Sequence, residues 1–307
     1  MQVLTVATRG TDLAIVQTEL VISALKKIYS DIDIKVKKIT SAGDKDQRTA
    51  LWNLKASGFF TSQVEDALLA GEADFAVHSF KDLPTRQRDG LNITAVCERR
   101  FVEDCLIAAE PINSVGELGR FARIGTSSLR RTAQMKRLRP DFKLIPVRGN
   151  VRTRINLLTS GKVDAIILAR AGIERLGLGG EISFCFDPKQ FIPAPAQGAL
   201  AVQTRTDDIE TRRLIAAMDD EKSRTVTFAE RQVLVTMQCG CHAPVGTFAE
   251  ISGDEIVIYA FISDLEGESF IRRQIAGLAV QADKLAGKLA NQLLDAGGRE
   301  ILVKLER

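Results

Sequence analysis

A pattern of strand, turn and helix that occurs twice limits the possible folds more than any other feature of the chain. Residues 3–7 are an apolar segment followed by a small-residue turn, and apolar residues then recur at helical spacing from Leu13 to Ile28. Residues 32–39 alternate between apolar and polar positions, as a half-buried strand does. Residues 123–131 repeat the short strand, the turn and the helix start. Strands separated by helices predict a parallel α/β sheet.

A second similarity within the chain indicates two related α/β units. Residues 68–77 and residues 157–167 each contain a helix end closed by a glycine, then an aspartate and a buried apolar strand. We therefore predict one α/β lobe in residues 1–97 and a second, basic and anion-binding lobe in residues 101–193.

The remainder of the chain predicts a crossover and a third domain. Residues 191–200 hold two prolines and a glycine, as a crossover between lobes would, and we assign residues 197–219 to the first lobe. In residues 220–307, a helix, alternating strand patterns and an amphipathic helix closed by Gly297 and Gly298 predict a small α+β domain. The predicted architecture is two α/β lobes with a ligand cleft between them, and a C-terminal α+β domain.

Composition excludes several classes of protein. The chain has 307 residues, of which 45% are hydrophobic and 26% charged, values typical of soluble globular proteins. Its apolar runs fall far short of the roughly 20 residues that a membrane-spanning helix needs. The first residues lack the pattern of a signal peptide, and five irregularly spaced cysteines do not predict a disulfide framework. We expect a cytoplasmic protein with reduced thiols and no membrane partner.

One segment of the chain is strongly basic. Residues 120–154 contain eleven Lys or Arg and one acid, Asp141, a net charge of +10 in a chain whose total is +3. Such a segment favours binding of an anion or a nucleic acid, although a solvated basic helix face has the same composition. The aromatic residues of this segment are only Phe121 and Phe142, too few to stack on bases, so we expect no nucleic-acid partner.

Arginines lie in three turns that follow predicted strands. The turn from Gly125 to Arg131 places hydroxyls and backbone N–H groups at a helix N-terminus, where an anion is favoured. Residues 148–154 follow a second strand, and Arg9 lies at the equivalent turn of the first lobe. Ligands of open α/β sheets bind at the carboxyl ends of strands, so these turns suit a substrate with several carboxylates. An ordinary helix cap with surface arginines is the alternative.

Two charged residues follow the buried strand at residues 75–77. Lys81 and Asp82 can supply a cation and a carboxylate to one site. A carboxylate among cations stays ionised at neutral pH, so Asp82 suits a counter-charge to a cationic intermediate better than a general acid. A charged turn on the surface is the alternative for an isolated pair of this kind.

The segment Cys239-Gly240-Cys241-His242 invites a metal site, which we reject. The chain has only two histidines and no second cysteine pair at zinc-ligand spacing. A cysteine–histidine dyad is disfavoured too, because adjacent residues in an extended loop point apart. The segment therefore predicts a loop cysteine that is available for covalent attachment.

Six motifs, taken in order, resemble those of the hydroxymethylbilane synthase family, also called porphobilinogen deaminase. The motifs lie at residues 7–9, 76–84, 125–131, 148–154, 195–199 and 240–246, and the resemblance covers essentially the whole chain. It implies two periplasmic-binding-protein-like (type II) lobes and a third α+β domain. We expect a monomer.

The resemblance also implies a transferase with a dipyrromethane cofactor, held by a thioether to Cys241 in the third domain. Porphobilinogen loses ammonia, and the free α-position of the growing chain attacks the electrophile that results. Four head-to-tail additions and a final hydrolysis give hydroxymethylbilane, in tetrapyrrole and haem biosynthesis. Each pyrrole carries an acetate and a propionate, and these accumulating carboxylates would explain the basic segment.

Individual residues take their roles from the same resemblance. Asp82 would sit by the pyrrole nitrogens and stabilise positive charge as it develops. The cofactor would be held by Lys81, Ser128, Arg130 and Arg131. The substrate-side rings would be held by Arg9, Thr11, Thr126, Arg148 and Arg154. Ser79 and Gln197 would be further cleft residues, and Phe60 would cover the site from a loop.

Two positions depart from the family's pattern. The loop before Phe60 usually reads Gly-Gly-Lys-Gly, whereas the lysine here is Lys55, displaced by two residues; our hypothesis is that Lys55 reaches the same carboxylates. Cys239 stands where glycine is usual, and the Gly-Cys-His-x-Pro pattern assigns the anchor to Cys241. The alternatives are a non-catalytic two-lobed binding protein for a polycarboxylate anion, and a synthase impaired by its altered loop.

Overall fold

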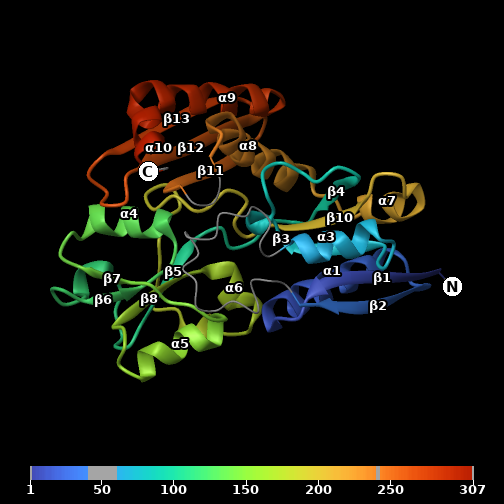
Figure 1. Ribbon diagram of the computed structural model, residues 1–307, viewed down its shortest axis with the longest axis horizontal. Coiled ribbons are helices and arrows are strands. Elements are labelled where there is room, and N and C mark those ends of the chain that lie inside the picture. The colour runs from blue at the N-terminus through green and yellow to red at the C-terminus, as the bar shows by residue number, and fades with distance from the viewer. Residues whose placement is uncertain (1, 41–60, 240–242, 306–307) are drawn as a thin grey trace. The chain divides into compact units, whose positions relative to one another are not determined.

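The computed structural model describes residues 2–40, 61–239 and 243–305, which form two compact units (Figure 1). The first unit contains the described residues up to Arg100 together with Gly198–Arg224. The second contains Phe101–Gln197 together with the described residues from Thr225 onward. The predicted three-part division, with its boundaries, stays a prediction. Among the described residues, no helix is long and apolar enough to cross a membrane.

The first unit is built on a sheet of five described strands in the order β2-β1-β3-β10-β4. The strands are β1 (Gln2–Arg9), β2 (Ile32–Ile39), β3 (Phe75–Ser79), β4 (Leu91–Val96) and β10 (Leu200–Arg205). The helices are α1 (Asp12–Ile28), α3 (Ser62–Leu69), the 3₁₀ turn η2 (Phe80–Asp82) and α7 (Ile209–Ala216). Strand β1 pairs in parallel with β2 and β3, and β10 is antiparallel to both of its neighbours.

The second unit contains a sheet with the same plan, in the order β7-β6-β8-β5-β9. The strands are β5 (Asp104–Ala108), β6 (Arg123–Gly125), β7 (Lys143–Ile145), β8 (Ala165–Ala169) and β9 (Phe184–Cys185). The helices are η3 (Val115–Glu117), α4 (Leu129–Leu138), α5 (Val151–Thr159), α6 (Arg170–Arg175) and η4 (Gly179–Glu181). Here β6 is parallel to β7 and β8, and β5 is antiparallel to β8 and β9. Both sheets therefore share a parallel core with one antiparallel strand in fourth place, which confirms the predicted α/β lobes, whereas the ligand cleft between them stays a prediction.

The internal repeat extends to single hydrogen bonds. Asp74 accepts a bond from the Thr5 backbone N–H at 2.6 Å and donates its own N–H to the Thr5 carbonyl at 2.8 Å. Asp164 makes the same two bonds to Arg123, at 2.7 and 2.9 Å. A glycine with φ of +70° or +63° (Gly71, Gly161) ends the preceding helix in each case. The aspartate thus fixes the central strand to its neighbour in both sheets, which confirms the repeat.

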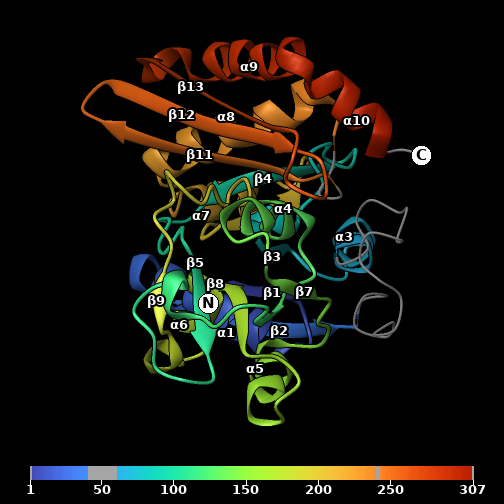
Figure 2. The ribbon, with the colours of Figure 1, turned by 90° about the vertical axis from the view of Figure 1, so that its left-hand side faces the viewer.

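The C-terminal part of the second unit is an antiparallel sheet with helices on one face (Figure 2). Its elements are α8 (Glu221–Met237), β11 (Val245–Ser252), β12 (Glu255–Ser263), β13 (Phe270–Leu278), η5 (Ala279–Gln281), α9 (Ala282–Leu293), η6 (Leu294–Gly298) and α10 (Arg299–Leu305). Ile256, Ile258 and Ile262 of β12 pack with α8 and α9, whereas Phe261 packs on the other face against Ile192. The glycines expected to end the last helix instead form a kink, with φ of +111° at Gly297, from which α10 continues.

A buried carboxylate fixes α8 to two other segments of the second unit. The Glu230 side chain is fully buried, and its two oxygens accept the N–H groups of Ala196 at 2.6 Å and Ala249 at 2.7 Å. Ala196 lies in the proline-containing crossover, in the left-handed region at φ of +59°. The carboxylate therefore holds the crossover and β11 on the same helix.

We predict that Glu230→Gln lowers the free energy of unfolding by about 2–4 kcal/mol. The amide retains one acceptor oxygen and turns an N–H toward a backbone N–H, so one buried donor loses its partner. Urea denaturation measures the change, with the exposed Glu255→Gln as a control that should stay within about 0.5 kcal/mol. Equal effects of the two variants would contradict an anchoring role for Glu230.

Candidate functional site

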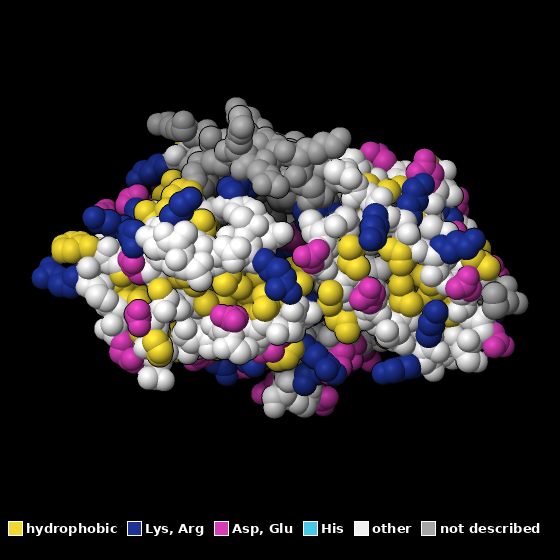
Figure 3. Space-filling view, turned by 90° about the horizontal axis from the view of Figure 1, so that it is seen from below, with side chains coloured by type: hydrophobic (Ala, Val, Ile, Leu, Met, Phe, Trp, Pro, Cys, Tyr) yellow, Lys and Arg dark blue, Asp and Glu magenta, His cyan; other side chains and the backbone are white. Residues whose placement is uncertain are grey.

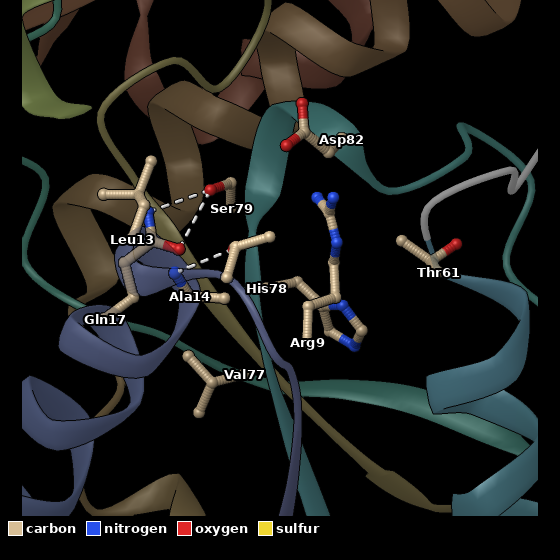
Figure 4. Close-up of a pocket in the computed structure, with 10 residues that line it drawn as sticks. Arg9, Leu13, Ala14, Gln17, Thr61, Val77, His78, Ser79 and Asp82 are labelled. Carbon is tan, nitrogen blue, oxygen red and sulfur yellow. Dashed lines mark hydrogen bonds between the residues drawn. The ribbon is translucent and has the colours of Figure 1, made fainter. Parts of the chain in front are cut away.

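A pocket lies in the first unit, at the carboxyl ends of the parallel strands β1 and β3 and the N-terminus of α1 (Figure 4). It is lined by Arg9, Thr11, Leu13, Ala14, Gln17, Thr61, Val77, His78, Ser79 and Asp82. The structure thus brings together four residues that the sequence singled out: Arg9, Thr11, Ser79 and Asp82. Ligands of open α/β sheets bind at this position in the fold.

Local sequence places two of these residues at the pocket. Thr11 is the N-cap of α1, and its hydroxyl accepts a hydrogen bond from the Ala14 N–H at 3.4 Å. Asp82 ends η2, which is fixed by the fully buried Phe80, whose N–H donates to the Ala199 carbonyl at 3.1 Å. With Phe80 anchored, Asp82 is left exposed, and the Arg9 guanidinium extends toward its carboxylate in Figure 4. Lys81, on the same turn, is half-buried.

Sequence reasoning missed three polar residues of the pocket: Gln17, Thr61 and His78. Gln17 is 4% exposed and its side-chain amide is hydrogen-bonded to the Ser79 hydroxyl, with the nitrogen at 2.9 Å. The sequence could have indicated Gln17 through its spacing, because it lies three residues after Ala14 and four after Leu13 and so shares one helix face with them. His78 lies within the motif at residues 76–84, yet nothing in the sequence shows whether its ring lines a pocket or has only a structural role.

Burial keeps the His78 ring neutral. The side chain is 6% exposed, and loss of hydration lowers its pKa from 6.5 to about 4, although the nearby Gln203 side chain opposes the shift and the charge of Arg9 adds to it. The ring can therefore serve the pocket as a hydrogen-bonding group without charge at neutral pH.

The second unit gathers another set of predicted residues at the carboxyl edge of its sheet. The turn after β6 is joined to the segment after β7, because the Thr126 N–H donates to the Ile145 carbonyl at 2.9 Å and the Val147 N–H to the Ser127 hydroxyl at 3.0 Å. Ser128 is the N-cap of α4, and Asn150 is the N-cap of α5. Thr126, Ser128, Arg148 and Arg154 therefore belong to adjoining turns that begin two helices, where backbone N–H groups favour an anion.

Arg130, Arg131 and Gln197 meet at a residue that sequence reasoning did not select. Asp104 is fully buried at the start of β5, and its oxygens accept bonds from Arg130 at 2.7 Å, from Arg131 at 2.7 and 3.0 Å, and from the Gln197 amide at 3.0 Å. Burial alone would raise the Asp104 pKa, but the two guanidinium groups outweigh it and hold the pKa well below the usual 3.8. The cluster retains a net charge of +1.

Acids from the fold neutralise part of the basic segment. Within the described residues, acids from outside the segment form ion pairs with it: Asp164 with Arg123, Glu266 with Lys136, and Asp104 with both Arg130 and Arg131. Figure 3 shows Lys and Arg interspersed with Asp and Glu on the face that it displays. The +10 of the segment therefore overstates the charge that remains for a ligand.

Three predicted residues, Lys55, Phe60 and Cys241, lie outside the described residues. Cys239 is 9% exposed and belongs to the apolar core between α8, α9 and β12. A side chain packed in this core is poorly placed to carry an external group.

Two family models match the chain. The model described as "Porphobilinogen deaminase, dipyromethane cofactor binding domain" covers residues 4–213, and "Porphobilinogen deaminase, C-terminal domain" covers residues 224–295. The chain belongs to the porphobilinogen deaminase family. This match confirms two expectations that the motifs implied: a dipyrromethane cofactor-binding domain, and a transferase of tetrapyrrole biosynthesis.

Curated relatives of this family match over nearly the full chain. The porphobilinogen deaminase of Roseiflexus castenholzii is 40% identical over 97% of this chain and 98% of its own length. That of Syntrophobacter fumaroxidans is 36% identical over 100% of this chain and 99% of its own. Among solved structures, the methionine-binding protein MetQ is 12% identical, covers 70% of this chain and 89% of its own, and has a TM-score of 0.45. The family assignment rests on the sequence matches alone.

We predict that Asp104→Asn lowers stability at pH 7 by about 3–5 kcal/mol, because two buried guanidinium groups lose their counter-charge. The ionised carboxylate stabilises the fold above pH 3.8, and this contribution is lost as the pH falls below that value toward the depressed pKa. The difference in free energy of unfolding between wild type and Asp104→Asn should therefore become smaller below about pH 4. Urea denaturation at pH 7 and pH 3 measures it.

The matched control is Asp295→Asn, which removes an exposed pair with Arg299 and should change stability by less than about 1 kcal/mol. An Asp104→Asn variant as stable as this control at pH 7 would show that the cluster does not stabilise the fold.

Proposed function

We propose that this chain is a hydroxymethylbilane synthase that joins four porphobilinogen molecules head to tail and releases hydroxymethylbilane by hydrolysis. The observation that carries the proposal is the pocket of the first unit, where Arg9, Thr11, Ser79 and Asp82 converge in a chain of this family. Cationic and hydroxyl groups that surround one carboxylate suit a substrate with acidic side chains and a positive charge that develops during reaction.

In this pocket Asp82 acts as the counter-charge. Loss of ammonia from porphobilinogen leaves an electron-poor pyrrole, and a carboxylate that is fixed beforehand stabilises that charge as it appears. Phe80 and the η2 turn hold Asp82 in place, so little reorganisation is needed during the reaction. Arg9 and Thr11 bind the acetate and propionate carboxylates, and Gln17 orients the Ser79 hydroxyl toward the ring.

The residues of the second unit fit a group with several carboxylates. The adjoining N-termini of α4 and α5 offer backbone N–H groups, and the cluster around Asp104 retains a charge of +1. We assign Ser128, Arg130 and Arg131, together with Lys81, to holding the dipyrromethane cofactor, and Thr126, Arg148 and Arg154 to the substrate-side rings. Gln197 acts through Asp104, whose position its amide fixes. When bound, the cofactor supplies the pyrrole carbon to which the first substrate is joined.

Several finer assignments complete the proposal. Cys241 carries the thioether, since Cys239 packs in the apolar core. Lys55 supplies the displaced loop cation, and Phe60 covers the site. The protein acts as a cytoplasmic monomer. The family matches support an enzyme and give no support to the alternative of a non-catalytic binding protein.

Cofactor attachment is tested by the intact mass of the denatured protein. Wild type and Cys239→Ser should each exceed their sequence mass by one dipyrromethane, whereas Cys241→Ser should have its bare mass. A bare wild-type mass that stays unchanged after addition of porphobilinogen would contradict the synthase. Added mass on Cys241→Ser but not on Cys239→Ser would move the anchor to Cys239.

The counter-charge role of Asp82 predicts a selective loss of turnover. Asp82→Asn should lower kcat by about 100-fold or more with a small change in KM, because the carboxylate acts mainly on charge that develops in the transition state. Steady-state consumption of porphobilinogen measures both constants. Asp89→Asn, an exposed acid outside the pocket, is the control and should match wild type. A kcat for Asp82→Asn within threefold of wild type would rule out this role.

A further inference from the structure

Two buried polar atoms that line the pocket have no hydrogen-bond partner within the described residues. The Thr61 hydroxyl oxygen and the His78 Nε2 belong to side chains that are 2% and 6% exposed. Buried polar atoms in folded proteins are nearly always paired, because leaving one unpaired costs free energy. Within the described residues neither atom has a hydrogen-bond partner, so each can take one from a ligand.

The Thr61 hydroxyl does not make the capping hydrogen bond that is usual for a threonine at the N-terminus of a helix. Thr61 is the N-cap of α3, yet its side chain makes no bond to the first turn of that helix. N-cap threonines are favoured because their hydroxyl accepts such a bond. The local structure therefore leaves the Thr61 hydroxyl available to a ligand.

The two groups come from different elements and line the pocket together with one cation. Thr61 precedes α3, His78 is on β3, and Arg9 ends β1, and Figure 4 shows the three side chains at the pocket. The charge of Arg9 favours an anion, and a hydroxyl and an uncharged imidazole can each donate one further hydrogen bond to it. Glu65, the buried acid of this region, is already bonded to the Gln203 amide at 3.0 Å.

We propose that Thr61 and His78 form, with Arg9, a subsite that binds one carboxylate of porphobilinogen through the Thr61 hydroxyl and the His78 Nε2. The inference rests on the proposed function and adds to it the groups that orient the substrate ring. Both are positioning residues, because they contact a substituent of the ring and not the reacting carbon.

Thr61→Val tests the subsite with almost no change in shape. KM for porphobilinogen should rise roughly tenfold, since a hydrogen bond to a charged group is lost, and kcat should stay within about threefold. Thr61→Ser, which restores the hydroxyl, should return KM to within about threefold of wild type. His78→Asn should raise KM in the same direction, measured on protein whose thermal unfolding confirms that it is folded.

The matched control is Thr94→Val, which removes a buried hydroxyl from the same unit that is bonded to Thr204 at 2.7 Å and lies outside the pocket. Its KM should equal that of wild type. A second readout is competition by a porphobilinogen derivative in which the bound carboxylate is converted to an amide. Its inhibition constant should be nearly the same for wild type and Thr61→Val.

Failure of the proposed subsite and failure of the proposed function give different experimental results. Active wild type with an unchanged KM for Thr61→Val, or equal rises for Thr61→Val and Thr94→Val, would overturn the subsite alone. Failure of Thr61→Ser to restore KM would do the same. Wild type that consumes no porphobilinogen would overturn the proposed function, and the subsite with it.

Discussion

The buried ion pair of Asp104 with two arginines is the interaction on which the second unit depends. One carboxylate without solvent access pairs with both guanidinium groups and also accepts a hydrogen bond from the Gln197 amide. Arg130 and Arg131 begin α4, Asp104 begins β5, and Gln197 lies near the end of the crossover. The cluster therefore fixes a helix start, a strand start and the crossover at one point, and loss of the Asp104 carboxylate would leave two buried positive charges.

Two further aspartates organise the central strands of both sheets. Asp74 and Asp164 each form hydrogen bonds to the backbone of the neighbouring strand through both their side chain and their own N–H. These bonds set the register of the parallel strands, and the register places the turns after β1, β3, β6 and β7 at the carboxyl edge of their sheets. The predicted ligand-binding residues are in those turns because the parallel sheet ends there.

Buried polar residues differ in whether their side chains are hydrogen-bonded within the fold. Arg130 and Arg131 contact acceptors inside the fold, so their effect on a ligand is that of a fixed positive charge. Thr61 and His78 are buried with polar atoms that nothing in the described protein satisfies, so their role is directed at a ligand. Buried polar groups are nearly always paired, so the unpaired atoms of Thr61 and His78 are the ones that a bound ligand can satisfy.

The sequence by itself determined the fold class, the repeat, the family and four residues of the pocket, because these depend on periodicity, turn chemistry and short motifs that are local in the chain. Only the tertiary structure decided which polar residues are buried and what they contact. Asp104 lies 26 residues from Arg130 and 93 from Gln197, and Thr61 and His78 come from separate elements. Burial and pairing at such separations arise from packing between elements, which no local pattern of residues records.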